Sequence, residues 1–284
     1  MNIAYRFRIY PTEEQKILLG KTFGCCRFLY NQMLNDKIQE YEKTKKMLKN
    51  TPAMYKKEYP FLQEVDSLAL ANVQLHLEKA YKNFFREPKI GFPRFKSKHH
   101  SRNSYTTNLV NGNILVESKR IRLPKLKWIA MKKHREPAED FRLKSVTVSM
   151  EPSGKYFASL LYEGYSCENQ AAEPDYSTAT ILGIDYTMQG MAVFSETEEA
   201  GFFRKNEKRL AREQRKLSRC IRGSHNYELQ KKKVARCHEK IRNQRRDYLH
   251  KLSRKIADNY DAVAVEDIDM KAMGQCLHFG KSVQ

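Results

Sequence analysis

The chain begins with alternating apolar and polar positions, a pattern that predicts a β-strand. The alternation covers residues 3–10 with a period of two and ends at Pro11. Thr12 then stands at the position of a helix cap, and Gln15 stands where the partner residue of a capping box belongs. The fold is therefore predicted to start with a strand that leads at once into a capped helix.

Two amphipathic helices are predicted in residues 12–87. The second begins at Asp66 or Ser67, and Pro52 and Pro60 are expected to mark turns between the two helices. Arg, Lys and Tyr fall on the outer faces, which suits either contact with nucleic acid or a solvated basic face. Helical spacing does not choose between these two interpretations, and the basic character of the whole chain favours the first.

Short strand patterns separated by tight turns fill residues 104–165. Val146 and Val148 alternate with polar neighbours, as a strand with one exposed face requires. We expect residues 111–113 (Asn-Gly-Asn) to form a hairpin turn, and the strands to curl with residues 3–10 into a small barrel. The strand candidates are Ser104–Leu109, Ile114–Val116, Ile121–Leu123, Lys127–Lys132, Arg142–Glu151 and Tyr156–Tyr162.

The second half of the chain contains short apolar runs that end in an acid. A polar segment at 166–178 precedes them and is interpreted as a domain linker. One run, at 180–185, ends in Asp185, and another, starting at Ala262, ends in Glu266. Two buried strands of this kind would deliver both carboxylates to the C-terminal edge of a sheet, where open α/β sheets place ligands.

The order of elements between these runs points to a nuclease. A second strand is expected at 190–195, residues 200–204 are a candidate for a third, and helical sequence covers 205–259 with a break near Gly223. Three strands, a helical segment and a strand, with an acid on the first and last, is the order of the RNase H-like nuclease fold. Its chemistry needs clustered carboxylates, because Mg²⁺ prefers oxygen ligands and paired ions stabilise the oxygens of phosphodiester hydrolysis.

Charge identifies the kind of partner. The chain has a net charge of +20, and residues 204–255 alone hold 20 Lys and Arg against 5 Asp and Glu. So large an excess of positive charge favours a polyanionic binding partner. Nucleic acid is the first candidate, and a membrane surface is the alternative. The sequence shows no apolar run of about 18 residues and no signal-peptide core at its start. We therefore expect a cytoplasmic, nucleic-acid-associated protein with no membrane partner.

Residues 88–102 interleave basic residues with aromatic residues and prolines. The Lys and Arg side chains are expected to contact phosphates. Phe92 and Phe95 could stack on bases or pack inward, and packing is the expected outcome.

Short segments spread along the chain resemble one known family. They are Tyr5–Thr12, Asn31, Gly91–Ser97, Ser104–Thr107, Ile121–Leu126, Leu182–Asp185, His238–Ile241, Asn243–Asp247, Val265–Asp267 and Met270–Met273. In this order they resemble the TnpB (OrfB) proteins of insertion sequences, RNA-guided nucleases related to the type V CRISPR effectors. The resemblance extends from end to end of the chain.

The resemblance implies a multidomain α+β fold. A helical recognition module would be inserted in a wedge-like β-barrel, and an RNase H-like (RuvC) α/β domain would follow. The corresponding residues are 1–11 with 88–165 for the barrel, 12–87 for the helical insertion, 166–178 for the linker, and 179–284 for the nuclease domain with its basic helical hairpin at 204–258. The partners implied are a guide RNA and a target DNA that carries a short adjacent motif.

The resemblance also assigns the site. Asp185 would be the first RuvC carboxylate and Glu266 the second, both catalytic and both ligands of Mg²⁺ or Mn²⁺. Asp267 would be a neighbour and not a ligand, and Asp269 would be structural. The candidate nucleic-acid contacts are Arg6, Arg8, Arg94, Lys96, Lys98, Arg209, Arg212, Arg215, Lys216, Arg242, Arg245 and Arg246.

Two features of the family pattern are missing from these 284 residues. The resemblance implies a third RuvC aspartate and a zinc ribbon of CxxC pairs, whereas the six cysteines here are scattered without a CxxC pair. We therefore expect no zinc site, weak metal binding and little cleavage by this chain alone. The predicted function is an RNA-guided, metal-dependent DNA endonuclease of a transposable element. The alternative is a binding protein without catalysis, either a guided repressor or a remnant.

Overall fold

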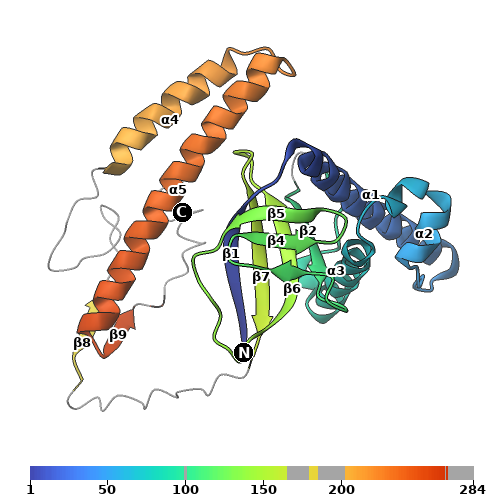
Figure 1. Cartoon of the computed structure of the whole chain (residues 1–284), viewed down its shortest axis with the longest axis horizontal. Helices are drawn as coiled ribbons and strands as arrows, with labels where there is room; N and C mark the ends of the chain where they lie inside the picture. The colour runs from blue at the N-terminus through green and yellow to red at the C-terminus, as the bar shows by residue number, and fades with distance from the viewer. Residues whose placement is uncertain (99–100, 165–178, 185–201, 266, 268–284) are drawn as a thin grey trace. The chain divides into compact units, whose positions relative to one another are not determined.

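The chain forms two compact units, Met1–Cys167 and Glu168–Gln284 (Figure 1). The computed structural model describes residues 1–98, 101–164, 179–184, 202–265 and 267. The boundary between the units falls inside the segment that the sequence suggests as a linker. Each unit has a sheet of its own.

The first unit is built on a seven-stranded antiparallel sheet with the order β2-β6-β7-β1-β5-β4-β3. The predicted first strand is confirmed, and it lies inside the sheet, where Arg8 pairs with Lys132 on one side and Phe157 on the other. The other strand candidates are confirmed to within a residue or two at their ends. The strands are β1 (Asn2–Tyr10), β2 (Asn103–Asn108), β3 (Leu115–Val116), β4 (Arg120–Leu123), β5 (Lys127–Lys132), β6 (Arg142–Met150) and β7 (Tyr156–Glu163).

The predicted hairpin after β2 is wrong, although its turn exists. Asn111 and Gly112 have left-handed backbone angles, with φ of 50° and 67°. However, β2 pairs along six residues with β6, whereas β3 has two residues and pairs with β4. Strand β2 therefore pairs with β6 through the longer set of backbone contacts, and β2 and β3 lie at opposite edges of the sheet. Among the described strands no pair joins these edges, so the sheet is open and the predicted barrel is not confirmed.

Helices fill the chain between β1 and β2. The predicted capping box of the first helix is confirmed, with Thr12 and Gln15 each bonding the backbone N–H of the other. Asp66 caps α3 by accepting a hydrogen bond from the backbone of Leu68. The helices are α1 (Glu13–Thr44), α2 (Pro52–Glu58), the 3₁₀ turn η1 (Pro60–Gln63), α3 (Ser67–Arg86) and the 3₁₀ turn η2 (Pro88–Ile90). Proline starts three of these elements because its fixed φ suits a first helical turn, so the prolines begin helices and do not only mark turns.

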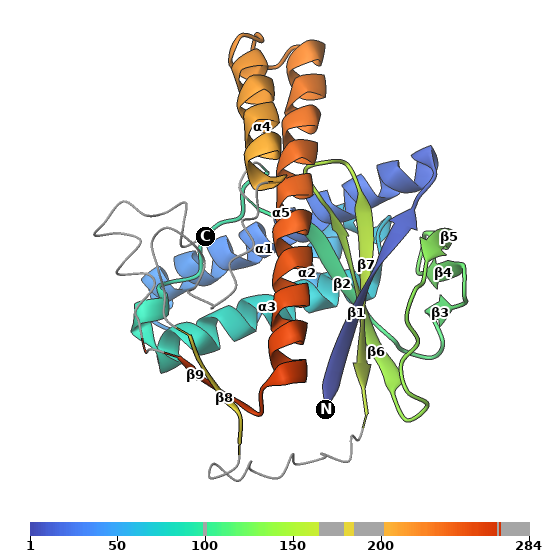
Figure 2. The ribbon, with the colours of Figure 1, turned by 90° about the vertical axis from the view of Figure 1, so that its left-hand side faces the viewer.

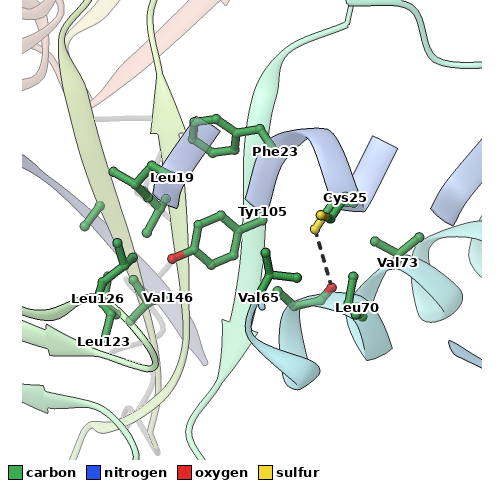
Figure 3. Close-up of a cluster of buried hydrophobic side chains, with 14 of the residues drawn as sticks. Leu19, Phe23, Cys25, Val65, Leu70, Val73, Tyr105, Leu123, Leu126 and Val146 are labelled. Carbon is green, nitrogen blue, oxygen red and sulfur yellow. Dashed lines mark hydrogen bonds between the residues drawn. The ribbon is translucent and has the colours of Figure 1, made fainter. Parts of the chain in front are cut away.

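The core of the first unit lies between α1, α3 and the sheet. Figure 3 shows Tyr105 of β2 among apolar side chains from both helices and from the sheet. Phe23 of α1 lies 6.0 Å from Tyr105 between ring centroids, and Leu19 and Val146 have no exposed surface. Burial of the Tyr105 hydroxyl raises the pKa of this side chain. Each fully buried side chain of this size stabilises the fold by about 1.5–3 kcal/mol, so the helices are firmly attached to the sheet.

The described part of the second unit is a parallel strand pair and a helical hairpin (Figures 1 and 2). The strands are β8 (Ile181–Ile184) and β9 (Ala262–Val265), and the helices are α4 (Phe202–Ser218) and α5 (His225–Asn259). The predicted break is confirmed, because Gly223 has a φ of 84° and Ser224 caps α5. The candidate strand at 200–204 is wrong from Phe202 onward. No glycine or proline separates these residues from the helical run, and they join it. The predicted strand at 190–195 lies outside the described residues.

Candidate nucleic-acid interface and metal site

The two strands that precede the candidate carboxylates are direct neighbours. Strands β8 and β9 are parallel and in register from Ile181 opposite Ala262 to Ile184 opposite Val265. The helical hairpin supplies the long crossover that a parallel pair requires. The next residues in the sequence, Asp185 and Glu266, lie outside the described residues. The predicted site needs two strands that end side by side, and this register provides them. The site itself stays a prediction.

The starts of the two strands are held together by one residue. Asp261 accepts a hydrogen bond from the backbone N–H of Thr180 on its carboxylate, at 2.9 Å, and donates its own N–H to the Thr180 carbonyl, at 3.0 Å. These contacts fix the register at the end of the strands opposite to Ile184 and Val265. Asp261 therefore has a structural role in aligning the strands.

The described residues contain no cluster of potential metal ligands. No group of three or more His, Cys, Asp or Glu side chains comes together in these segments. Asp267 is described and exposed to solvent. The prediction that Asp185 and Glu266 bind the metal ion is not tested by these residues; carboxylate oxygens in general suit a hard divalent cation.

The helical hairpin is held together by a polar seam as well as by apolar contacts. Gln230 of α5 donates hydrogen bonds to the backbone carbonyl and the carboxylate of Glu213 on α4, at 3.0 and 2.8 Å. Asn206 and Gln244 form a second amide contact between the helices. Since Glu213 and Gln230 are both buried, their mutual hydrogen bonds offset the cost of burying them.

The Glu213 carboxylate links the stability of the hairpin to pH. The pKa of Glu213 is lowered, first by the Gln230 hydrogen bond and then by Lys216, against burial that raises it. Because the folded pKa lies below the unfolded one, the stabilisation is complete above the unfolded pKa and is lost as pH falls through the folded value. We expect the hydrogen-exchange protection of α4 and α5 to decrease as the pH is lowered from the unfolded pKa of Glu213 through its folded pKa. Exchange measured by mass spectrometry and corrected for intrinsic rates would show it.

A matched pair of variants tests this assignment. Glu213→Gln should remove the pH dependence of protection, because the side chain no longer titrates. Glu207→Gln, on the same helix at an exposed position 3.9 Å from Arg245, should retain it. Identical pH profiles for Glu213→Gln and the native protein would show that another group controls the hairpin.

The hairpin exposes most of the cations that the sequence singles out. On α4, Arg209, Arg212, Arg215 and Lys216 are all exposed, at spacings of three and four residues that keep them near one face. On α5, Arg242 and Arg246 are exposed and Arg245 is half-buried. The sequence analysis did not single out a further exposed set on α5, although the run of consecutive lysines was visible. That set is Lys231, Lys232, Lys233, Arg236 and Lys240.

The cations predicted on β1 are engaged within the protein. Arg6 forms an ion pair with Glu151, and its guanidinium lies 4.0 Å from the ring centroid of Phe157. Arg8 is half-buried and its guanidinium lies 5.1 Å from the Tyr10 ring centroid. Both arginines therefore contact other side chains of the first unit, and their contact with nucleic acid stays a prediction.

The predicted contacts after α3 divide into two kinds. Arg94 and Lys98 are exposed. Lys96 is half-buried, its ammonium lies 3.9 Å from the Tyr30 ring centroid, and burial lowers its pKa. Phe92 packs against α3 as expected but stays partly exposed, and Phe95 is exposed, so the prediction that both pack inward is wrong for Phe95.

Across the described residues, no helix has the length and apolar content of a membrane span.

Family profiles match both halves of the chain. A profile described as a probable transposase (OrfB_IS605) matches residues 164–276, and a profile described as a helix-turn-helix domain of the same family matches residues 1–46. Within the second range the structure has strand β1 and one continuous helix, α1, in place of a helix-turn-helix.

Two curated proteins are similar over nearly the whole chain. "Putative RNA-guided DNA endonuclease InsQ" of Escherichia coli (strain K12) is 32% identical over 287 residues, with 96% of this chain and 67% of that protein covered. "Putative RNA-guided DNA endonuclease" of Streptomyces pristinaespiralis is 32% identical over 283 residues, with 94% and 67% covered. A solved Cas12f1–sgRNA–target DNA complex aligns with all of this chain and 81% of its own, at 12% identity and a TM-score of 0.31, which is too distant to inform the fold.

Proposed function

Because the chain belongs to the TnpB (OrfB) family of transposon-encoded proteins, we propose that it acts as an RNA-guided DNA endonuclease. The observation that carries this proposal is the pair of parallel strands β8 and β9, which end in register one residue before Asp185 and Glu266. A strand pair of this kind suits an RNase H-like (RuvC) nuclease domain in the second unit. The first unit, with its antiparallel sheet and inserted helices, would be the wedge-like and recognition part.

Asp185 and Glu266 would hold the metal ion of this reaction. Their carboxylate oxygens suit Mg²⁺ or Mn²⁺. When bound, such an ion acts as a Lewis acid toward the phosphodiester and activates the attacking water. The chain's own contribution would be two carboxylates that directly follow adjacent strands in the sequence, and Asp261 supports this by fixing the register of the strands.

The basic hairpin would hold the nucleic acid. The exposed cations of α4 and α5 neutralise phosphates, and this binding releases counterions and weakens with salt. The crossover from β8 to β9 contains both helices, so the phosphate-binding surface and the carboxylate-bearing strands are parts of one continuous segment. Guide RNA and target DNA are the proposed partners.

Guided cleavage in the presence and absence of Mg²⁺ tests the proposal. The protein, produced together with its guide RNA, is incubated with a plasmid that carries the matching sequence, with Mg²⁺ or with EDTA. Nicked or linear plasmid that requires guide, match and Mg²⁺ is the expected result for a chain that also carries the third RuvC aspartate, and little product is expected from these 284 residues alone. Plasmid that is bound but stays intact in Mg²⁺ would instead identify a guided binding protein without catalysis.

A further inference from the structure

Four aromatic side chains form a compact patch where α3 ends. Tyr81, Phe84 and Phe85 come from the last turns of α3, and Phe92 comes from the loop that follows. The Phe92 ring stands edge-on to the rings of Tyr81 and Phe84, with centroids 5.5 and 5.4 Å away. Phe85 lies nearly parallel to Tyr81 at 6.2 Å. We call these four residues the aromatic patch.

The outer rings of the aromatic patch face solvent. Phe85 is 65% exposed and Phe92 is 45% exposed, while Tyr81 is buried beneath them. A single exposed apolar side chain is ordinary on a protein surface. Two exposed rings held in position by two further rings are a different case, because the arrangement presents rigid flat surfaces that the core does not use.

The surroundings of the aromatic patch are strongly basic. Residues 79–98 contain seven Lys or Arg and one acid, Glu87. Arg86, Lys89 and Arg94 are all exposed. Exposed aromatic rings among cations match the surface that binds unpaired nucleic acid, on which bases stack while the cations follow the phosphates. A purely apolar protein partner would offer no negative charge to pair with these cations.

The loop beside the aromatic patch is fixed before any partner binds. The Asn31 side chain on α1 accepts the Lys96 backbone N–H at 2.8 Å and donates to the Lys96 carbonyl at 2.9 Å. Pro93 is buried, so the loop is anchored on both sides of Arg94 and of Phe95, which is 56% exposed. Holding the exposed pair in place reduces the entropy lost on binding.

We propose that the aromatic patch is a stacking site for unpaired bases of a nucleic-acid strand, with Arg86, Lys89 and Arg94 on the adjoining phosphates. This proposal rests on the proposed function, which supplies the nucleic-acid partner. The site binds a single strand by its bases, whereas the hairpin cations bind phosphates of a strand or a duplex alike. Phe85 carries the largest exposed ring surface of the patch.

Substitution of Phe85 separates stacking from charge. The full chain is titrated with fluorescein-labelled oligothymidylate and with a mixed-sequence DNA duplex at several salt concentrations. Phe85→Leu should weaken binding of the single strand by at least about fivefold, since stacking contributes about 1–3 kcal/mol per base. Duplex affinity and the slope of affinity against salt should stay unchanged, because no cation is lost. Phe85→Tyr should restore single-strand binding.

Leu75→Ala is the matched control, because Leu75 is an exposed apolar residue on the same helix at a different angle around its axis. It should bind both probes as the native protein does.

Native-like single-strand binding by Phe85→Leu would overturn the inference while leaving the proposed function intact. A lowered urea midpoint for Phe85→Leu would also overturn it, by showing that another part of the protein covers this ring. A native chain that binds neither probe would remove the proposed function itself.

Discussion

In a chain that also carries the third RuvC aspartate, replacing Asp185 with asparagine should reduce guided DNA cleavage at least about 100-fold and leave DNA binding intact. The amide of Asp185→Asn keeps the size of the side chain but removes the negative charge that a divalent cation needs. A bound ion contributes several kcal/mol of charge stabilisation to phosphodiester hydrolysis, and each 1.36 kcal/mol is tenfold in rate. Single-turnover cleavage of a matched target, with binding followed in parallel by gel shift, measures both quantities.

Asp267→Asn is the control for that experiment. Asp267 is exposed, lies one residue after Glu266, and is assigned no metal contact, so its substitution should leave cleavage within about twofold of the native rate. Glu266→Gln should behave like Asp185→Asn. If Asp185→Asn cuts at the native rate, or if Asp267→Asn is equally inactive, the assignment of the carboxylates is wrong.

Neutralising the exposed face of α4 should produce the largest loss of nucleic-acid affinity. The variant replaces Arg209, Arg212, Arg215 and Lys216 with glutamine. If all four contact phosphates, the slope of log affinity against log salt should flatten by about 3, because each contact contributes about 0.7–0.9. Fluorescence anisotropy with labelled RNA and duplex DNA, from low to moderate salt, gives the slope and the affinity together.

A second charge-neutralised variant distinguishes local contact from total charge. Lys43, Lys45, Lys46 and Lys49 lie at the end of α1 and in the segment after it, and all four are exposed. Their replacement by glutamine removes the same charge from another part of the chain and should change the slope much less. Equal slopes for the two variants would show that binding depends on net charge and not on the hairpin.

Local signals in the sequence were sufficient for most elements of this fold. The capping box at Thr12, the alternation of β1 and the break at Gly223 each rest on a few neighbouring residues, and each is confirmed. The pairing of β2 with β6 could not be read in this way. It depends on residues some 40 positions apart, of which the hydroxyl contact between Thr106 and Thr147 is one.

The candidate site shows the same division. The run of basic residues predicts the cationic hairpin, because an excess of charge is visible without knowing the fold. The contacts of Arg6 with Glu151 and of Lys96 with Tyr30 are tertiary, so composition could not predict them, and the assignment of both cations to nucleic acid stays a prediction. The exposure of Phe85 follows from helix geometry, because adjacent aromatic residues 100° apart on a helix cannot all face one core.

Helix α5 is continuous, so its length and its helical repeat determine where its side chains meet any molecule that binds along it. Its 35 residues span about 52 Å, close to the length of 15 base-pair steps, and end directly before β9. Inserting one residue would rotate every cation on the far side by about 100° relative to that strand, whereas seven residues make nearly two whole turns. Relatives can therefore lengthen or shorten this helix only by numbers of residues close to whole turns, such as about 7, 11 or 18, matched on α4, if the cations are to keep their phase with the carboxylate-bearing strand.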